Sequence, residues 1–111
     1  MASTRVLDPR VRRFADWFIR VLQANGVTVT VTSTRRSLDE QRQLYDRFKR
    51  GLSKYPAAPP GQSTHGAGIA MDLHLDPPVY AAAGALWEQC GFTWGGRFHD
   101  EIHFDFRPFR R

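Results

Sequence analysis

The segment from residue 63 to residue 75 constrains the fold more than any other, because a glycine-bearing turn in it leads into a strand-like alternation. After His65 in the turn, the apolar residues Ile69, Met71, Leu73 and Leu75 alternate with Ala70, Asp72, His74 and Asp76. A period of two is typical of a half-buried strand, with one face toward the core and the other toward solvent. We therefore expect this strand to present a carboxylate and an imidazole on its polar face, with another imidazole just upstream.

A second segment near the C-terminus has the same character. Over residues 101–106, the apolar Ile102, Phe104 and Phe106 alternate with Glu101, His103 and Asp105. If the two strands lie side by side, their polar faces bring His65, Asp72 and His103 together. Two neutral imidazoles, one carboxylate and an open fourth position form the donor set of a catalytic zinc site. An unpaired charge inside an apolar strand is costly, so Asp72 also needs a partner.

The length and the helical patterns predict the fold class. A chain of 111 residues is expected to form one domain over residues 1–111, and a bound metal would stabilise a core of this size. Helical spacing predicts a helix from Asp8-Pro9 to Asn25-Gly26, a second from Ser37 to Gly51, and a third from Asp76-Pro77-Pro78 to Gly91. Alternating β-branched residues predict a strand over residues 27–32. Together these elements predict an α+β fold, with a small antiparallel sheet and about three helices.

The sequence also predicts which side chains of the first two helices are buried and how the chain ends. Core packing is the default for Trp17, which flanks the apolar stripe of the first helix. In the second helix, the buried side is predicted to carry Leu38, Gln41, Leu44, Tyr45 and Phe48, after a capping box of Ser37 and Glu40. The basic tail over residues 107–111 is expected to fray.

Charge and composition limit the partners. Lys and Arg number 16 against 11 Asp and Glu, for a net charge of +5. This positive charge is compatible with an anionic partner, either nucleic acid or a cell-wall polymer. It is equally compatible with a soluble domain from an arginine-rich proteome. The single cysteine, Cys90, excludes an intrachain disulfide. No apolar run is long enough to span a membrane, and the N-terminus lacks a signal-peptide apolar region, so we expect synthesis in the cytosol without an export route of its own.

Two other metal patterns are possible and are disfavoured. His74-x-Asp76 with His103 mimics the triad of iron oxygenases, which needs a double-sheet barrel with more strands than this chain predicts. His99-x-x-x-His103 mimics a zincin motif with aspartate in place of glutamate. That motif requires a helix, whereas the alternation around His103 predicts a strand.

The chain contains three motifs with characteristic spacing: Ser63-x-His65-x-x-Gly68-x-Ala70-x-Asp72, Trp94-Gly-Gly-x-Phe98-x-Asp100-x-x-His103-Phe104, and Ser33-Thr-Arg-Arg36-Ser37-x-x-x-Gln41-x-x-Leu44-Tyr45. These motifs resemble those of the zinc peptidases of bacterial cell walls. This family includes D-alanyl-D-alanine carboxypeptidases, vancomycin-resistance D,D-dipeptidases and phage L-alanyl-D-glutamate endolysins, and it has a hedgehog/D,D-peptidase-like fold. The resemblance runs from about residue 27 to residue 106, and the order and separation of the two metal motifs are specific.

The resemblance implies roles for individual residues. It implies zinc held by His65, Asp72 and His103, and a catalytic carboxylate at Asp100, for which the neighbouring Glu101 is the rival. Arg36 aligns with the family arginine and would stabilise an oxyanion or hold a substrate carboxylate. Ser63 would position the loop or the substrate. Thr34-Arg35 stands where the family usually has Gly-Tyr, so which of Arg35 and Arg36 points into the site stays open.

The predicted function is zinc-dependent hydrolysis of peptidoglycan stem peptides. The segment from Trp94 to Asp100 is more similar to the phage endolysin branch, which favours an L-alanyl-D-glutamate endopeptidase over the alternative, a D-alanyl-D-alanine carboxypeptidase. A zinc-containing wall-binding module without activity is a further alternative, which Asp100 disfavours. Nucleic acid is not expected as a partner, because most aromatic residues fit buried stripes. We expect a monomer that acts on the cell wall as a phage or prophage product.

Overall fold

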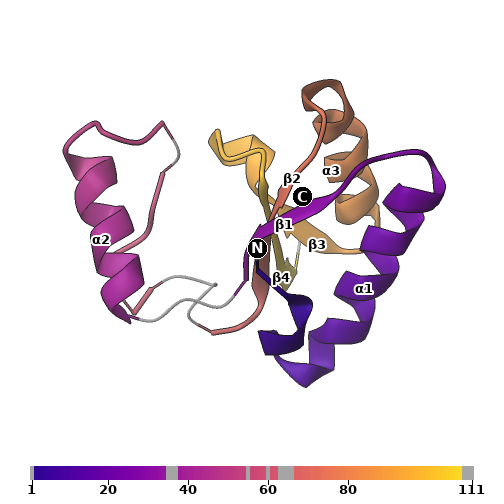
Figure 1. Ribbon diagram of the computed structural model, residues 1–111, viewed down its shortest axis with the longest axis horizontal. Helices are drawn as coiled ribbons and strands as arrows, with labels where there is room; N and C mark the ends of the chain where they lie inside the picture. Colours follow the sequence, from indigo (N-terminus) through magenta and orange to yellow (C-terminus); the bar gives the residue numbers. More distant parts are fainter. Residues whose placement is uncertain (1, 35–37, 55, 60, 63–66, 109–111) are drawn as a thin grey trace.

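The protein is described by a computed structural model that covers residues 2–34, 38–54, 56–59, 61–62 and 67–108. Its α-helices and strands form an α+β fold, as predicted (Figure 1). The helices are α1 (Pro9–Ala24), α2 (Leu38–Lys49) and α3 (Tyr80–Gln89), with short 3-10 helices η1 (Thr4–Val6), η2 (Pro77–Val79) and η3 (Gly95–Phe98). The strands are β1 (Thr30–Ser33), β2 (Ala70–His74), β3 (Phe92–Trp94) and β4 (His103–Pro108).

The four strands form one antiparallel sheet in the order β1-β2-β4-β3. The two segments singled out by their alternation, β2 and β4, are therefore the central pair. Their register places Ala70 opposite Asp105, Met71 opposite Phe104, and Asp72 opposite His103. Because side chains alternate along a strand, Asp72 and His103 share one face and Met71 and Phe104 share the other.

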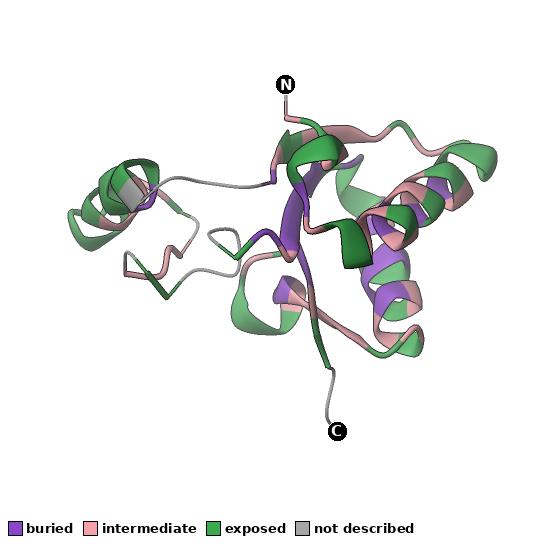
Figure 2. Ribbon diagram, turned by 90° about the horizontal axis from the view of Figure 1, so that it is seen from below, coloured by how far each residue is buried: buried purple, intermediate pink, exposed green. Residues whose placement is uncertain are grey.

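The core lies between the sheet and the helices α1 and α3 (Figures 1 and 2). Its centre is the fully buried Trp87, whose ring contacts those of Phe18 and Phe104 at centroid distances of 4.7 and 5.9 Å. The indole Nε1 of Trp87 donates to the backbone carbonyls of Thr93 (3.1 Å) and Asp105 (3.0 Å). The aromatic core thus fixes the backbone of β4 from the side opposite to the polar face.

Helix α1 begins and ends where the sequence predicts. Asp8 caps it by accepting from the backbone N–H of Arg10 at 2.9 Å, and Pro9 occupies the first turn. The expectation of core packing for Trp17 is wrong, because its side chain is 40% exposed and contacts Phe14 at the edge of the core. Trp17 lies at the margin of the apolar stripe, and no element covers that margin in the described part of the chain.

Helix α2 stands apart from the sheet and from the other two helices (Figures 1 and 2). The prediction of a buried side holds for Gln41, whose amide Nε2 donates to the carbonyl of Ala58 at 2.7 Å. It is wrong for Phe48, which is 38% exposed, while Leu44 and Tyr45 are half-buried. The helix packs on its own following connection rather than on the sheet, so its apolar stripe is covered in part. The predicted capping residue Ser37 and the side chain of Leu38 lie outside the described residues.

Two other boundaries differ from the prediction. The 3-10 turn η2 precedes α3, and the Asp76 carboxylate makes no capping hydrogen bond. Strand β4 continues through Arg107 and Pro108, where fraying was expected, because Thr93 on β3 donates its hydroxyl to the carbonyl of Arg107 at 2.9 Å. Residues 109–111 lie outside the described part. Among the helices described, none is long and apolar enough to cross a lipid bilayer.

Candidate metal centre

The pairing of β2 with β4 brings Asp72 and His103 together. Oδ1 of Asp72 and Nδ1 of His103 lie 3.3 Å apart, and the two side chains are only 9% and 14% exposed. Two ligand atoms on one tetrahedral zinc ion lie about 3.4 Å apart, given zinc–nitrogen and zinc–oxygen distances of about 2.1 Å. The spacing of this pair therefore fits two neighbouring ligands of a single ion.

The third predicted ligand, His65, lies outside the described residues, as does Ser63 in the same loop. Within the ranges described, no group of three or more His, Cys, Asp or Glu side chains could hold a metal ion. Asp72 and His103 supply one carboxylate oxygen and one imidazole nitrogen, and both donor types are usual for zinc. One more nitrogen would complete a set of three protein ligands with an open fourth position.

His103 has a second carboxylate partner, which sequence reasoning placed on the same face without giving it a role. Its Nε2 lies 2.8 Å from Oδ2 of Asp105, two residues further along β4. Asp105 is fully buried and is also bound by the Arg107 guanidinium, with Nη2 at 2.8 Å from Oδ2. The period-two alternation of β4 was the signal in the sequence, since it already put His103 and Asp105 on one face.

These contacts control the protonation of the imidazole. Burial lowers the pKa of His103, but the hydrogen bonds to Asp105 and Asp72 and the charges of both carboxylates outweigh it and raise the pKa to about 9. Burial raises the pKa of Asp105, but the hydrogen bonds from His103 and Arg107 lower this pKa by more. The pKa of Asp105 is therefore below its ordinary value. With this pKa His103 is an imidazolium at neutral pH, so a metal ion that bound at Nδ1 would have to displace a proton.

Asp100, the predicted catalytic carboxylate, lies one turn away from His103. Its backbone N–H donates to the carbonyl of Gly95 (2.9 Å), and its own carbonyl accepts from the N–H of His103 (3.1 Å). The second bond closes a four-residue turn that holds Asp100 and His103 close together. The Oδ1 atom of Asp100 is buried.

Gly95 is required at the base of this turn. A Cβ atom added there would lie 2.4 Å from the carbonyl oxygen of Asp100 and 2.8 Å from Cβ of His103. Neither neighbour is the free end of a flexible side chain, so any larger residue at position 95 must displace the backbone that carries both functional groups.

Trp94 braces the same loop from outside. Its ring lies against Gly84 of α3 and Gly96 of η3, where added Cβ atoms would come within 2.1 and 2.2 Å of ring carbons. Its Nε1 donates to the carbonyl of Glu101 at 2.8 Å, and Arg97 pairs with Glu88 of α3. The sequence analysis singled out the motif from Trp94 to Asp100, but it did not predict that the ring of Trp94 would pack against two glycines.

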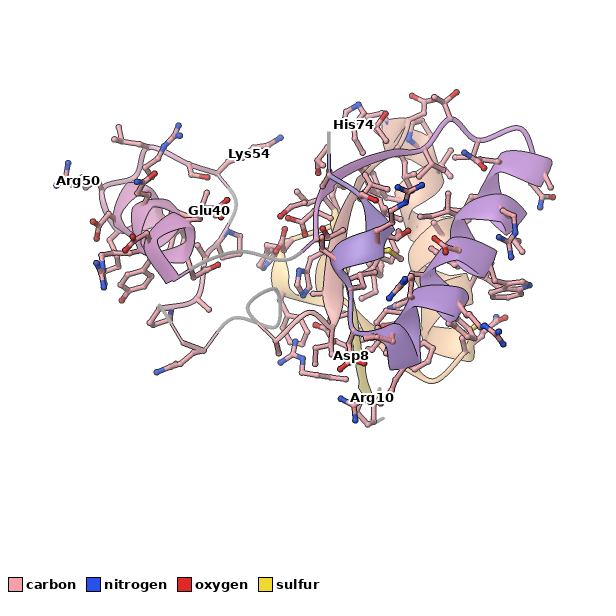
Figure 3. The ribbon with its side chains drawn as sticks, turned by 60° about the horizontal axis from the view of Figure 1, so that its bottom comes forward. Asp8, Arg10, Glu40, Arg50, Lys54 and His74 are labelled. Atoms are coloured by element: carbon pink, nitrogen blue, oxygen red, sulfur yellow. The ribbon has the colours of Figure 1, made fainter. Side chains whose placement is uncertain are left out.

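The remaining candidates are exposed or lie outside the described residues. His74 is exposed at the end of β2, on the sheet side of the molecule (Figure 3). His99 is exposed and adopts a left-handed conformation with φ 63°, and Glu101 is exposed in the turn before β4. Arg35 and Arg36 are outside the described residues, so the choice between them stays a prediction.

Comparison with known proteins identifies a family for the chain. The family model for D-alanyl-D-alanine carboxypeptidase, VanY, matches residues 4–105. No curated protein sequence matches the chain.

Solved structures share the fold at low sequence identity. A mutant of the vancomycin-resistance D,D-pentapeptidase VanY, from a VanB-type resistance cassette and in complex with Zn(II), is 19% identical, with a TM-score of 0.72 over 90% of this chain and 72% of that one. The LD-carboxypeptidase LdcB is 20% identical, with a TM-score of 0.72 over 92% of this chain and 66% of that one. The L-Ala D-Glu endopeptidase ChiX from Serratia marcescens is 24% identical, with a TM-score of 0.64 over 94% of this chain and 83% of that one. The family model spans nearly the whole chain, which therefore belongs to the VanY family and is a peptidase that acts on peptidoglycan.

Proposed function

We propose that residues 1–111 form a single zinc peptidase domain that hydrolyses peptide stems of peptidoglycan, with zinc held by His65, Asp72 and His103. The observation that carries the proposal is the buried Asp72–His103 pair, whose ligating atoms are 3.3 Å apart. The VanY structure solved in complex with Zn(II) supports the choice of metal. The position of His65, seven residues before Asp72, supports it as the third ligand.

Zinc bound at these residues would lower the pKa of a water molecule and polarise the scissile carbonyl. Asp100, held one turn from His103, would act as general base toward the attacking water and as general acid toward the leaving amine. Arg36 supplies a planar guanidinium for the oxyanion or for a substrate carboxylate, and Ser63 positions the loop or the substrate. The two carboxylates thus have separate roles, Asp72 as a ligand and Asp100 as the proton carrier.

For the bond that is cut, we propose endopeptidase cleavage between L-alanine and D-glutamate. The segment from Trp94 to Asp100 supports this choice, because it is more similar to the endolysin branch of the family. The fold shared with the endopeptidase ChiX is compatible with it. An endopeptidase needs a groove that is open on both sides of the metal, and a short chain with few long loops provides such a groove more readily than a longer one.

A D-alanyl-D-alanine carboxypeptidase is the second candidate, favoured by the description of the matching family. Such an enzyme must recognise a free C-terminal carboxylate, which needs a committed cationic group. Arg36 could be that group. The two activities share the metal centre and the base. They differ in whether the cleaved bond lies next to the free C-terminus of the stem or inside the stem.

Digestion of purified peptidoglycan by the zinc-loaded protein separates the candidates. The endopeptidase produces new amino groups on D-glutamate and detaches stems from the sugar strands, whereas the carboxypeptidase releases free D-alanine and leaves the stems attached. Asp100→Asn serves as the matched inactive control. Wall binding by the wild type without either product would instead identify an inactive zinc-containing binding module.

A further inference from the structure

The polar face of β4 carries a continuous chain of hydrogen bonds from Arg107 through Asp105 to His103. From it we infer that Asp105 and Arg107 are positioning residues, which set the orientation and the tautomer of His103 so that Nδ1 faces the metal position beside Asp72. This inference rests on the zinc site proposed above, and it assigns a role to two residues that the metal motifs do not contain.

The two carboxylate partners of His103 determine the tautomer of its imidazole. Nε2 of His103 lies 2.8 Å from Oδ2 of Asp105, and Nδ1 lies 3.3 Å from Oδ1 of Asp72. An ionised carboxylate only accepts hydrogen bonds, so the proton of a neutral His103 stays on Nε2 when it bonds to Asp105. The lone pair is then on Nδ1, on the side of Asp72, which is the state that a metal ligand requires.

Arg107 fixes the position of the Asp105 carboxylate. Arg107 donates to Oδ1 from its backbone N–H (2.9 Å) and from Nε (3.1 Å), and to Oδ2 from Nε (3.1 Å) and Nη2 (2.8 Å). The carbonyl of Asp105 accepts from Trp87 in the core at 3.0 Å. The carboxylate is therefore fixed through both its side chain and its backbone, and its burial strengthens each of these bonds.

A second Asp-x-Arg pair in the chain can be compared with Asp105 and Arg107. Asp8 and Arg10 form the same local contacts, with Nε to Oδ1 at 3.1 Å and Nη2 to Oδ2 at 2.8 Å. That pair is at the exposed start of α1, where Figure 3 shows both residues at the edge of the molecule. The local geometry is thus common to both pairs, and the difference at β4 is a fully buried carboxylate that also bonds a histidine next to the candidate metal position.

Replacing Asp105 by asparagine gives the sharpest test. An amide has one acceptor oxygen, and the Arg107 guanidinium, which has only donors, will bind that oxygen. The amide NH2 group then points at Nε2 of His103, which must accept, so the ring proton moves to Nδ1. A His103 protonated at Nδ1 cannot ligate through that atom.

The experiment measures zinc affinity by competition with a chromophoric chelator, and the His103 ring nitrogens by 15N NMR of the zinc-loaded protein. We expect wild type to show a metal-bound Nδ1 and a protonated Nε2. Asp105→Asn should bind zinc roughly 10- to 100-fold more weakly, the usual effect of losing an outer partner of a metal-bound histidine. Arg107→Gln, which keeps the carboxylate, should weaken binding by a smaller factor. The control Asp76→Asn removes one exposed carboxylate after β2 and should bind as wild type does.

Unchanged zinc affinity and ring signals in a folded Asp105→Asn would overturn the inference. If that variant does not fold, the wild-type spectrum decides, because a zinc-loaded protein with Nε2 bound to the metal contradicts it directly. Either result leaves the proposed function intact so long as wild type binds zinc and cleaves stems. A wild type that binds no zinc would overturn both.

Discussion

His103 lies between two carboxylates, and each of its ring nitrogens meets one of them. In the zinc site proposed above, a metal ion would therefore compete with a proton for Nδ1, while Asp105 would hold the proton on Nε2. The sequence predicted the first carboxylate, Asp72, from the paired polar faces. The role of Asp105 could not be predicted, because alternation gives the face of a residue but not which neighbour its side chain bonds.

Metal-free protein should lose stability as the pH rises from about 6.5 to about 9. The pKa of His103 is raised from 6.5 to about 9 in the folded state, so folding binds a proton across this range. Its contribution is complete below pH 6.5 and is lost as the pH rises through about 9. Urea unfolding in the presence of a chelator measures it. The variant His103→Gln should show a flatter dependence, and a wild type whose stability rises over this window would contradict the account.

Asp100→Asn should keep the fold and the zinc while kcat falls by about two to four orders of magnitude, the usual range for a general acid–base group. Glu101→Gln is the matched control and should have a mild effect, since Glu101 is exposed in the turn. Steady-state hydrolysis of peptidoglycan fragments gives both values. An active Asp100→Asn beside an inactive Glu101→Gln would exchange the two roles.

At the scale of elements, periodicity predicted β2, β4 and α1 closely, because the core covers most of their apolar faces. It predicted α2 as a helix but not its packing, since an apolar stripe does not specify which element will cover it. Phe48 and Trp17 are exposed for this reason. The braced loop from Trp94 to Asp100 was equally beyond prediction, because its shape depends on the ring of Trp94 lying against Gly84 in another element.

Gly95→Ala should impair the site through the backbone. The new Cβ would lie 2.4 Å from the carbonyl oxygen of Asp100, so the turn that carries Asp100 and His103 must shift. We expect a stability loss of about 1–3 kcal/mol, typical of overpacking, together with reduced zinc affinity and activity.

Gly26→Ala provides the matched control for that substitution. Gly26 has φ +82° and no atom within 4 Å of an added Cβ, so alanine there strains only the turn after α1. It should cost about 1 kcal/mol of stability and leave zinc affinity unchanged. Thermal melts and chelator competition compare the two variants, and equal zinc affinities in both would contradict a role for Gly95 in shaping the site.

For the whole molecule, the family match over residues 4–105 covers both the sheet body and α2. The body holds the core and the Asp72–His103 pair, while α2 stands apart. The charged residues Arg50 and Lys54 follow α2 and lie on its side of the molecule (Figure 3). With a net charge of +5, we propose that the protein is attracted to anionic cell-wall polymers.

Binding to isolated cell walls should therefore weaken with added salt. Exposed charges are screened over about 10 Å at 0.1 M salt, so higher ionic strength removes most of the attraction. Co-sedimentation with walls at low and high salt measures this. A bound fraction that does not change with salt would show that wall binding does not depend on charge.

The central claim, one zinc ion on the Asp72–His103 pair and His65, is tested most directly by the zinc content of purified variants. Elemental analysis should find one zinc per chain in the wild type, and zinc should be lost in both His103→Ala and His65→Ala. His74→Ala is the matched control, because His74 lies two residues from Asp72 on β2 but is exposed, and it should keep its zinc. Retention of zinc by His103→Ala, with loss in His74→Ala, would contradict the account.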